Sequence, residues 1–400
     1  MAFLSATLDR VAPSPTIAIS TRAREMKAAG RDVIALSAGE PDFDAPPHVA
    51  EAAIAAIRAG RTRYTAPDGI PELKAAIARK LLRDNGLSYG ADEVVVCTGG
   101  KQVIASALAA TLDPGDEVIV PAPYWVSYPD MTRLAGGAPA IAPTAAADGY
   151  RLTPEALEAA IGPRTKWLIL NSPGNPTGAG YAAGHLAALA AVLMRHPHVH
   201  VLSDDIYEHL VYDGFRFATI AQVEPRLRDR VLIVNGVSKS HAMTGWRIGY
   251  GAGPAPLIAA MRKVVSQTTS CACSVAQWAA VAALDGPQDF VRESRAAFAR
   301  RRDAVVAALG ACPGIACPVP EGAFYVYPSI AGCVGKVSAG GAAITDDEAF
   351  AAALLEEEGV AVVHGAAFGA SPAFRVSYAE ADDVLAEATA RIRRFAEGLR

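Results

Sequence analysis

The sequence lacks the usual signs of a disulfide-rich, metal-binding or membrane-spanning protein. Its six cysteines are spread over 400 residues without a CxxC pair, which argues against a disulfide framework and against a zinc site. No apolar run is long enough to cross a bilayer, because Arg, Lys or Glu interrupts each Ala-rich stretch. The first ten residues lack the apolar core and the positive charge of a signal peptide. These absences predict a reduced, cytoplasmic compartment and no membrane partner.

A strong positive charge is also absent. The formal net charge is -4 at pH 7, so no basic surface predicts binding to nucleic acid. The composition, with 52% hydrophobic and 20% charged residues, is that of an ordinary globular protein. A chain of 400 residues is expected to form two domains. His196, His198 and His200 alternate along an extended segment, but no carboxylate or cysteine completes a metal site, and we expect a loop at the solvent edge.

Short apolar runs alternate with helix-length segments through the middle of the chain. They lie at residues 93–97, 116–120, 167–170, 199–202 and 231–234, and Pro121 is expected to end the second run. Runs that are apolar throughout are typical of parallel strands covered on both faces, so the pattern predicts an α/β fold. Polar, Gly-rich motifs follow these runs, where open α/β sheets bind ligands.

The last third has a different pattern. A long charged helix is predicted at 289–309 and an amphipathic helix at 381–399, with strands between them at 322–327, 360–363 and 374–378. These elements predict a second, mixed α/β domain. The small-residue segments 142–149 and 335–341 are expected to be surface loops.

The pair Lys239 and Arg247 carries the most informative chemistry. A desolvated lysine can form an imine with an aldehyde, and an arginine eight positions later can bind a phosphate. Pyridoxal 5'-phosphate (PLP) has both groups. In isolation such a pair more often consists of a surface Lys and a structural Arg, so other motifs must decide.

Two motifs at strand ends supply groups that suit the PLP ring. Asp204 follows the run 199–202 and could pair with a protonated pyridine nitrogen, while Tyr207 could donate to the ring oxygen. A helix N-cap followed by a core tyrosine explains these two residues equally well. Asn175 lies in the loop 171–178, where two prolines and two glycines make either a stiff ligand-binding loop or an ordinary turn.

The remaining candidate residues can also be explained by structure alone. Gly99 and Gly100 open a predicted helix whose backbone N–H groups could bind phosphate, although the sequence is not a Walker A motif. Trp125 could stack on a ring or belong to the core. Arg375 lies on a predicted strand and therefore needs a carboxylate partner, either from a ligand or from a structural salt bridge.

As a set, these motifs resemble the class I aminotransferases among the fold-type I PLP enzymes, in the bacterial branch of aspartate and prephenate aminotransferases. The resemblance covers nearly the whole chain, at residues 38–43, 64–73, 99–102, 123–129, 171–178, 204–208 and 235–250. It implies a large PLP-binding domain at 45–285 with a mostly parallel seven-stranded sheet. It also implies a smaller α/β domain formed by both termini, 1–44 and 286–400.

The resemblance implies a role for each matching residue. Lys239 is expected to bind PLP and then to move the substrate proton. The other residues expected around the cofactor are Asp204 at the ring nitrogen, Tyr207 and Asn175 at the ring oxygen, Trp125 on the ring face, and Gly99, Gly100, Ser238 and Arg247 at the phosphate. Tyr64 is expected to reach the phosphate of a neighbouring subunit, which implies a homodimer with shared active sites.

The substrate is expected to lie between two cations. Arg375, helped by the Gly39 backbone, is expected to bind the α-carboxylate, and Lys101 the distal carboxylate, with Trp125 and Asn175 beside the substrate. The implied reaction is reversible amino transfer from L-aspartate to 2-oxoglutarate in two half-reactions, with amino acids and 2-oxo acids as partners. The small residues 103–106 could widen the pocket, so a prephenate or aromatic aminotransferase is the alternative.

Two further classes of protein share parts of this motif set. A β-lyase or decarboxylase has the same lysine and aspartate, and only the fate of the second substrate separates it from an aminotransferase. A PLP-binding transcription regulator needs an added basic domain, for which there is no room before residue 38. One departure from the family pattern concerns Gly236, where some relatives have a phosphate-binding serine. Ser238 could supply that contact instead.

Overall fold

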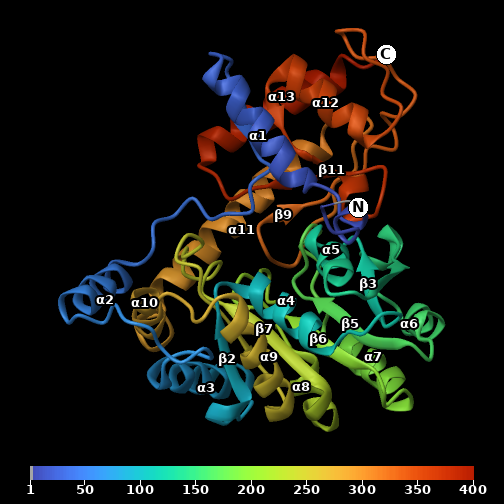
Figure 1. The fold of residues 1–400 in the computed structure, drawn as a ribbon. Helices are drawn as coiled ribbons and strands as arrows, with labels where there is room; N and C mark the ends of the chain where they lie inside the picture. The colour runs from blue at the N-terminus through green and yellow to red at the C-terminus, as the bar shows by residue number, and fades with distance from the viewer. Residues whose placement is uncertain (1–2) are drawn as a thin grey trace.

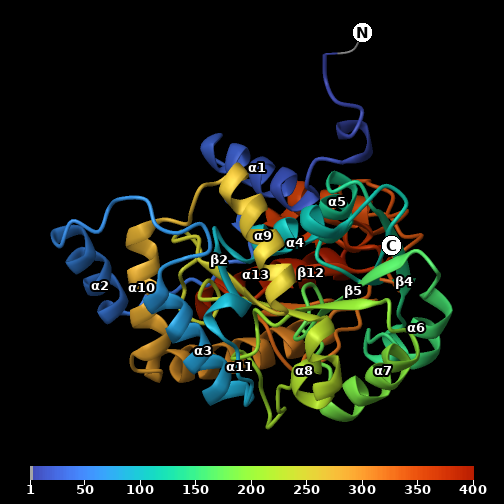
Figure 2. The same ribbon diagram turned by 60° about the horizontal axis from the view of Figure 1, so that its bottom comes forward.

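The computed structural model describes residues 3–400, so residues 1 and 2 of the predicted small domain lie outside it. The chain forms an α/β body around a large sheet and a second body built around α1 (Pro15–Ala28), α12 (Asp347–Glu358) and α13 (Asp382–Glu397), shown at the bottom and top of Figure 1. The segment before α1 projects from the surface in Figure 2, and its short turn Leu8–Arg10 contacts α5 (Ser127–Leu134) of the large body.

The large sheet has seven strands in the order β2-β8-β7-β6-β5-β3-β4. All neighbours pair in parallel except β8, which is antiparallel to β2 and β7. This confirms the predicted mostly parallel seven-stranded sheet. The strands are β2 (Val94–Cys97), β3 (Glu117–Ala122), β4 (Ala138–Pro143), β5 (Thr165–Asn171), β6 (His200–Asp204), β7 (Val231–Gly236) and β8 (Gly249–Ala252).

Two details of the predicted strands were wrong. The strand β3 continues through Pro121 to Ala122, because its pairing with β5 ends at Ile119. The Ala122 carbonyl bonds Thr144 on the β4 side, so the missing N–H of Pro121 faces the side where no ladder bond is required. The segment 142–149 was expected to be a loop, but its first two residues complete the edge strand β4.

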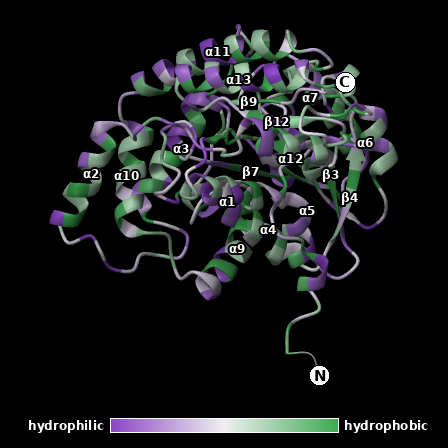
Figure 3. Ribbon diagram, turned by 90° about the horizontal axis from the view of Figure 1, so that it is seen from above, coloured by the Kyte–Doolittle hydropathy of each residue, from purple (hydrophilic) through white to green (hydrophobic). Residues whose placement is uncertain are grey.

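Helices cover both faces of the sheet because the strand residues are apolar on both sides. Along β2, Val94 and Val96 pack into one core, and Val95 and Cys97 into the other. The helices are α2 (Pro47–Arg58), α3 (Pro71–Asn85), α4 (Gly100–Thr111), α5 (Ser127–Leu134), α6 (Pro154–Ala160), α7 (Ala183–Arg195), α8 (Ile220–Val223), α9 (Ala255–Thr268) and α10 (Ser274–Asp285). In Figure 3 the outer helices carry both hydrophilic and hydrophobic residues.

The second body joins the two ends of the chain. Its strand β1 (Ile34–Ala35) pairs in parallel with β10 (Val360–Ala361). A three-stranded sheet has the order β11-β12-β9, with β9 (Tyr325–Val326), β11 (Val363–His364) and β12 (Phe374–Ser377). The strand predicted at 322–327 was therefore too long, and the strand predicted at 360–363 is divided at Val362 into β10 and β11. The predicted helices are confirmed as α11 (Asp289–Gly310) and α13.

We propose the division into residues 45–285 and the two terminal segments as the domain boundaries. One apolar core supports it by joining Leu36 near one end to Phe298, Phe350 and Phe395 near the other. Tyr207 from the large body also packs into this core. The site residues that follow β6 therefore contact both bodies.

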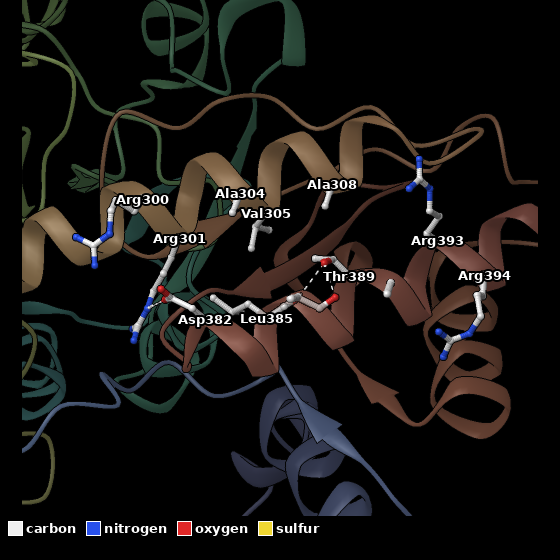
Figure 4. Close-up of a pocket in the computed structure, with 12 residues that line it drawn as sticks. Arg300, Arg301, Ala304, Val305, Ala308, Asp382, Leu385, Thr389, Arg393 and Arg394 are labelled. Atoms are coloured by element: carbon white, nitrogen blue, oxygen red, sulfur yellow. Dashed lines mark hydrogen bonds and ion pairs between the residues drawn. The ribbon is translucent and has the colours of Figure 1, made fainter.

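A groove of about 520 Å³ runs between α11 and α13. Figure 4 shows Arg300 and Arg301 at one end and Arg393 and Arg394 at the other, with Val305 on its floor. None of the predicted site residues lines it. Within residues 3–400, no helix has both the length and the apolar character needed to span a membrane.

Candidate active site

A cavity of about 400 Å³ lies at the carboxyl ends of β5, β6 and β7, where the two bodies meet. It brings together most of the predicted site residues, namely Gly39, Gly100, Lys101, Trp125, Asn175, Asp204, Tyr207, Ser238, Lys239, Arg247 and Arg375. Gly99 contacts Arg247 just behind the wall. Tyr64 is not in the cavity, and its side chain is 90% exposed. The sequence motifs therefore converge in space, with one exception.

Lys239 follows β7 and reaches the cavity floor. Its ammonium donates to the Gly39 carbonyl at 2.6 Å. Burial lowers the pKa of Lys239 to about 8; the charge of Glu40 opposes this shift, and Arg247 and Arg375 reinforce it. With this pKa, about a tenth of the molecules carry the free amine at pH 7, far more than for an ordinary lysine, which suits Lys239 to attack a carbonyl.

Asp204 ends β6 and is 6% exposed. Its Oδ2 accepts a hydrogen bond from the Tyr128 hydroxyl at 2.6 Å, and its Oδ1 accepts one from the Ile206 N–H at 3.3 Å. Burial raises the pKa of Asp204 to about 6, although these two hydrogen bonds lower it in part. The residues after it form a turn and no helix, so the N-cap interpretation is wrong. Within residues 3–400 no cationic side chain forms a salt bridge with this carboxylate, which leaves it available to a cationic ring nitrogen.

Tyr207 and Asn175 line the same cavity as Asp204. The Tyr207 hydroxyl is 2.8 Å from the Tyr325 hydroxyl. The Asn175 amide oxygen accepts from Arg375, and its backbone N–H donates to Asn171 Oδ1 at 2.8 Å. The side-chain nitrogen of Asn175 is then the donor available to a ligand oxygen. The loop 171–178 is therefore built to hold an amide toward the cavity.

The predicted phosphate-binding groups are brought together by close backbone packing. Gly99 has φ of 85°, a backbone conformation that favours glycine, and the Arg247 guanidinium packs directly against it, 2.4 Å from where a Cβ would lie. The helix α4 begins at Gly100, and its first N–H groups point toward an anion bound at this end. At Gly236, a Cβ would lie 2.9 Å from the Ile248 carbonyl oxygen, so the close approach of β7 and β8 accounts for glycine.

Arg375 is 2% exposed and has no carboxylate partner in the described part of the chain. Its Nη1 donates to Asn175 Oδ1 at 2.9 Å and its Nη2 to the Ser37 carbonyl at 2.5 Å, while Nε has no partner. The guanidinium stacks 4.8 Å from the Tyr325 ring and 5.0 Å from the Phe368 ring. A structural salt bridge was one explanation for this residue, and it is wrong. An incoming carboxylate would complete the set of partners.

Lys101 and Trp125 line the side of the cavity that faces α4 and α5. The Lys101 ammonium lies 4.8 Å from the centre of the Trp125 ring. Partial burial lowers the pKa of Lys101, and the nearby Arg247 adds to this. The Trp125 ring is half-buried and open to the cavity, which favours the stacking interpretation over a core position.

Tyr128, Tyr325 and Thr16 are among the cavity residues that the sequence motifs missed. Tyr128 lies on α5, three residues after Trp125, so its spacing could have indicated it. Tyr325 comes from β9 of the other body, and no local pattern marks it. Thr16, near the start of α1, has a buried hydroxyl without a partner.

The histidine segment does not form a metal site. His196 pairs with Glu158 at 2.8 Å, and His198 is 3.1 Å from the Gly162 carbonyl. Within residues 3–400, no group of three His, Cys, Asp or Glu side chains could hold a metal ion.

Comparison with known proteins identifies the family. Residues 31–392 match the family model described as aminotransferase class I and II. The chain is 65% identical over 399 residues to the aspartate/prephenate aminotransferase of Cereibacter sphaeroides, covering 100% of both chains. The crystal structure of the aspartate aminotransferase from Rhizobium meliloti superposes with a TM-score of 0.97 at 54% identity and full coverage of both chains. The aspartate aminotransferase from Thermus thermophilus with maleate gives 0.92 at 44% identity, covering 99% of this chain and 100% of that one.

The cavity fits the cofactor of this family. It offers an unpaired carboxylate for a ring nitrogen, two donors for a ring oxygen, an indole face, and a helix N-terminus with an arginine for a phosphate. It also offers a lysine whose lowered pKa suits imine formation. The fold, the converging residues and the matched family agree, and the chain belongs to the class I and II aminotransferases, which use pyridoxal 5'-phosphate.

Proposed function

We propose that this enzyme transfers the amino group of L-aspartate to 2-oxoglutarate. The main support for this assignment is that one cavity contains two cationic side chains, Arg375 and Lys101, together with Lys239. A substrate with a carboxylate at each end matches this arrangement. The similar proteins named aspartate aminotransferase support the same assignment.

PLP, when bound, supplies an aldehyde that takes the substrate's amino group and a ring that accepts an electron pair from Cα. The residues of the chain would orient this ring. Asp204 would pair with the ring nitrogen, Tyr207 and Asn175 would donate to the ring oxygen, and Trp125 would cover a face. Arg247, Ser238 and the N–H groups that follow Gly99 would hold the phosphate.

Lys239 moves the proton. As a free amine, it would take the proton from the substrate Cα and hold it for return. The Lys239 ammonium donates to the Gly39 carbonyl at 2.6 Å, which keeps it pointed into the cavity. Arg375 holds the α-carboxylate meanwhile, so that Cα stays within reach of the base.

Prephenate is a second candidate acceptor. Of the residues 103–106 that were expected to widen the pocket, only Ile104 lines the cavity, whereas Val103 and Ser106 are buried outside it. A substrate that has both a ring and a carboxylate would meet less steric hindrance from an aliphatic side chain at this wall than from an aromatic one. The 65% identical relative is named an aspartate/prephenate aminotransferase.

We further propose a homodimer in which Tyr64 reaches the partner's phosphate site. Tyr64 is 90% exposed, yet the following loop is rigid, because Gln277 accepts from the Ile70 N–H and donates to Thr65. Arg247 also borders a second, open cavity of about 730 Å³ outside the site, into which a partner side chain could reach. We place the enzyme in the cytoplasm, in keeping with its six free cysteines.

A panel of half-reactions tests the proposed substrate. The PLP form is mixed with one amino acid at a time, and the loss of its absorbance is followed. Aspartate and glutamate are expected to convert it faster than alanine or phenylalanine. Prephenate and 2-oxoglutarate are then compared as acceptors with the amine form. Equal rates for aspartate and alanine would contradict the assignment.

A further inference from the structure

Two buried tyrosine hydroxyls form a pair between the bodies of the molecule. Tyr207, which follows β6, and Tyr325, on β9, have their hydroxyl oxygens 2.8 Å apart. Both side chains are at most 3% exposed. Within residues 3–400 the Tyr325 hydroxyl has no other hydrogen-bonding partner. Each phenol has one proton, so only one of the two can donate across this contact.

The packing around Tyr325 holds its hydroxyl in place. A Cβ at Gly39 would lie 2.5 Å from the Tyr325 oxygen, so the glycine backbone leaves space for this hydroxyl. The Tyr325 ring also stacks on the Arg375 guanidinium. A single side chain therefore contacts the proposed α-carboxylate clamp and the proposed ring-oxygen ligand.

The surroundings determine which phenol donates. Burial raises the pKa of both phenols, and for Tyr207 it raises the pKa well above the usual range. The Arg375 charge lowers the pKa of both phenols, but its guanidinium is stacked against the Tyr325 ring, 4.8 Å from the ring centre, so the nearer charge favours Tyr325 as the more acidic partner. The more acidic phenol is the better donor. The proton of Tyr207 is then left to point into the cavity.

We infer that Tyr325 is a positioning residue, which donates to the Tyr207 oxygen and thereby directs the Tyr207 proton to the ring oxygen of the cofactor. A hydroxyl that accepts one hydrogen bond is a stronger donor in the next. This inference rests on the proposed role of Tyr207. It adds that the second body of the molecule, through this hydroxyl pair, affects the protonation of the bound cofactor.

The sign of a spectroscopic shift tests the inference. Donation to the ring oxygen competes with the proton shared between that oxygen and the imine nitrogen, so it lowers the pH midpoint of the bound cofactor's absorbance. Tyr325→Phe keeps the ring against Arg375 but removes the donor, and the midpoint is expected to rise by roughly half to one pH unit. If Tyr325 were instead the acceptor, its removal would free the Tyr207 proton and lower the midpoint. A fall, or no change, overturns the inference.

Three further variants separate this inference from the proposed function. Tyr207→Phe is expected to raise the midpoint at least as far, and Tyr207→Phe with Tyr325→Phe no further than Tyr207→Phe alone. If the midpoint shifts in Tyr207→Phe but not in Tyr325→Phe, only the positioning role of Tyr325 is overturned. If the midpoint does not shift in Tyr207→Phe, the proposed role of Tyr207 is overturned as well. Tyr327→Phe is the matched control, because its buried hydroxyl bonds the Gly365 and Ala370 carbonyls away from the cavity. Its loss is expected to lower stability and leave the midpoint unchanged.

Kinetics give an independent check on the same variants. Because the Tyr325→Phe ring still stacks on Arg375, the KM for aspartate is expected to stay within about twofold while kcat falls. A rise in KM with an unchanged kcat would show that Tyr325 serves the carboxylate clamp instead, and would overturn the inference.

Discussion

The Tyr128 hydroxyl donates to Asp204 Oδ2 at 2.6 Å inside a wall that excludes water. Tyr128 is an uncharged donor, so it orients the carboxylate without neutralising it. The negative charge of Asp204 is thus held in place at a cost in folding free energy, and a cationic ring nitrogen relieves that cost when it binds.

Asp204→Asn is expected to stabilise the cofactor-free protein by up to about 3 kcal/mol at pH 8. Burial raises the pKa of Asp204 from its usual 3.8 to about 6, so the folded state binds this proton more tightly than the unfolded state does. Its contribution to stability is complete below pH 3.8 and is lost as the pH rises through 6. Urea unfolding of both proteins should show equal stability near pH 4 and a gap that opens between pH 4 and 6. Equal stability at pH 8 would contradict this account.

The rate at which the cofactor-free protein takes up PLP is expected to rise with pH and to level off above a midpoint near 8. Only the uncharged Lys239 amine attacks an aldehyde, and burial lowers its pKa to about 8. Stopped-flow absorbance measures this uptake. A midpoint near 10, the value of an ordinary lysine, would show that Lys239 is not desolvated. Lys239→Ala should give no imine absorbance and no turnover.

Arg375→Lys is expected to lower kcat/KM for every amino acid by about 10- to 100-fold, mainly through KM. A lysine has neither the planar fork for two carboxylate oxygens nor the flat face that stacks between Tyr325 and Phe368. Arg302→Lys is the control, since Arg302 is equally buried but pairs with Asp213 and Asp303. Steady-state kinetics should show a normal KM for that control despite lower stability.

Lys101→Ala is expected to weaken the reaction with aspartate by about 10-fold or more and to leave alanine nearly unaffected. Only aspartate has a distal carboxylate for the Lys101 ammonium. The measurement is kcat/KM for each amino acid in wild type and variant. Equal losses of kcat/KM for the two substrates would mean that Lys101 supports Trp125 and does not bind the second carboxylate.

Mixing Tyr64→Ala with Lys239→Ala is expected to restore cofactor affinity in part of the sites. In a mixed dimer, one site receives both substitutions and the other receives neither. The affinity for PLP of each protein alone and of the mixture is measured by titration. No recovery after subunit exchange would mean that Tyr64 acts within its own subunit or has no role in the site.

Much of the sheet and of the cofactor side could be predicted from local pattern. The runs that became β2, β5, β6 and β7 are mostly apolar, and the residues after them carry the chemistry. Parallel strands bring their carboxyl ends to one edge of the sheet, so Asn175, Asp204 and Lys239 could be expected to lie close together. The end of β3 was less predictable, because Pro121 is tolerated only where its neighbour strand has stopped pairing.

Contacts between the two bodies were beyond local pattern. Tyr325 and Arg375 lie on short strands of the smaller sheet, and their approach to Tyr207 and Asn175 depends on how that sheet docks. The sequence could not predict that the Arg375 guanidinium lacks a carboxylate partner. A salt bridge can be excluded only when all the neighbours of the guanidinium are placed.

The sequence by itself determined the alternation of strands and helices, and with it the edge where lysine, aspartate and asparagine gather, because these depend on residue type and spacing along the chain. The tertiary structure alone decided that Tyr128 holds Asp204, that Tyr325 meets Tyr207, and that Arg375 is left without a carboxylate. The physical reason is that burial and hydrogen-bond partners, which set charge state and proton direction, belong to the packed arrangement and not to any one segment.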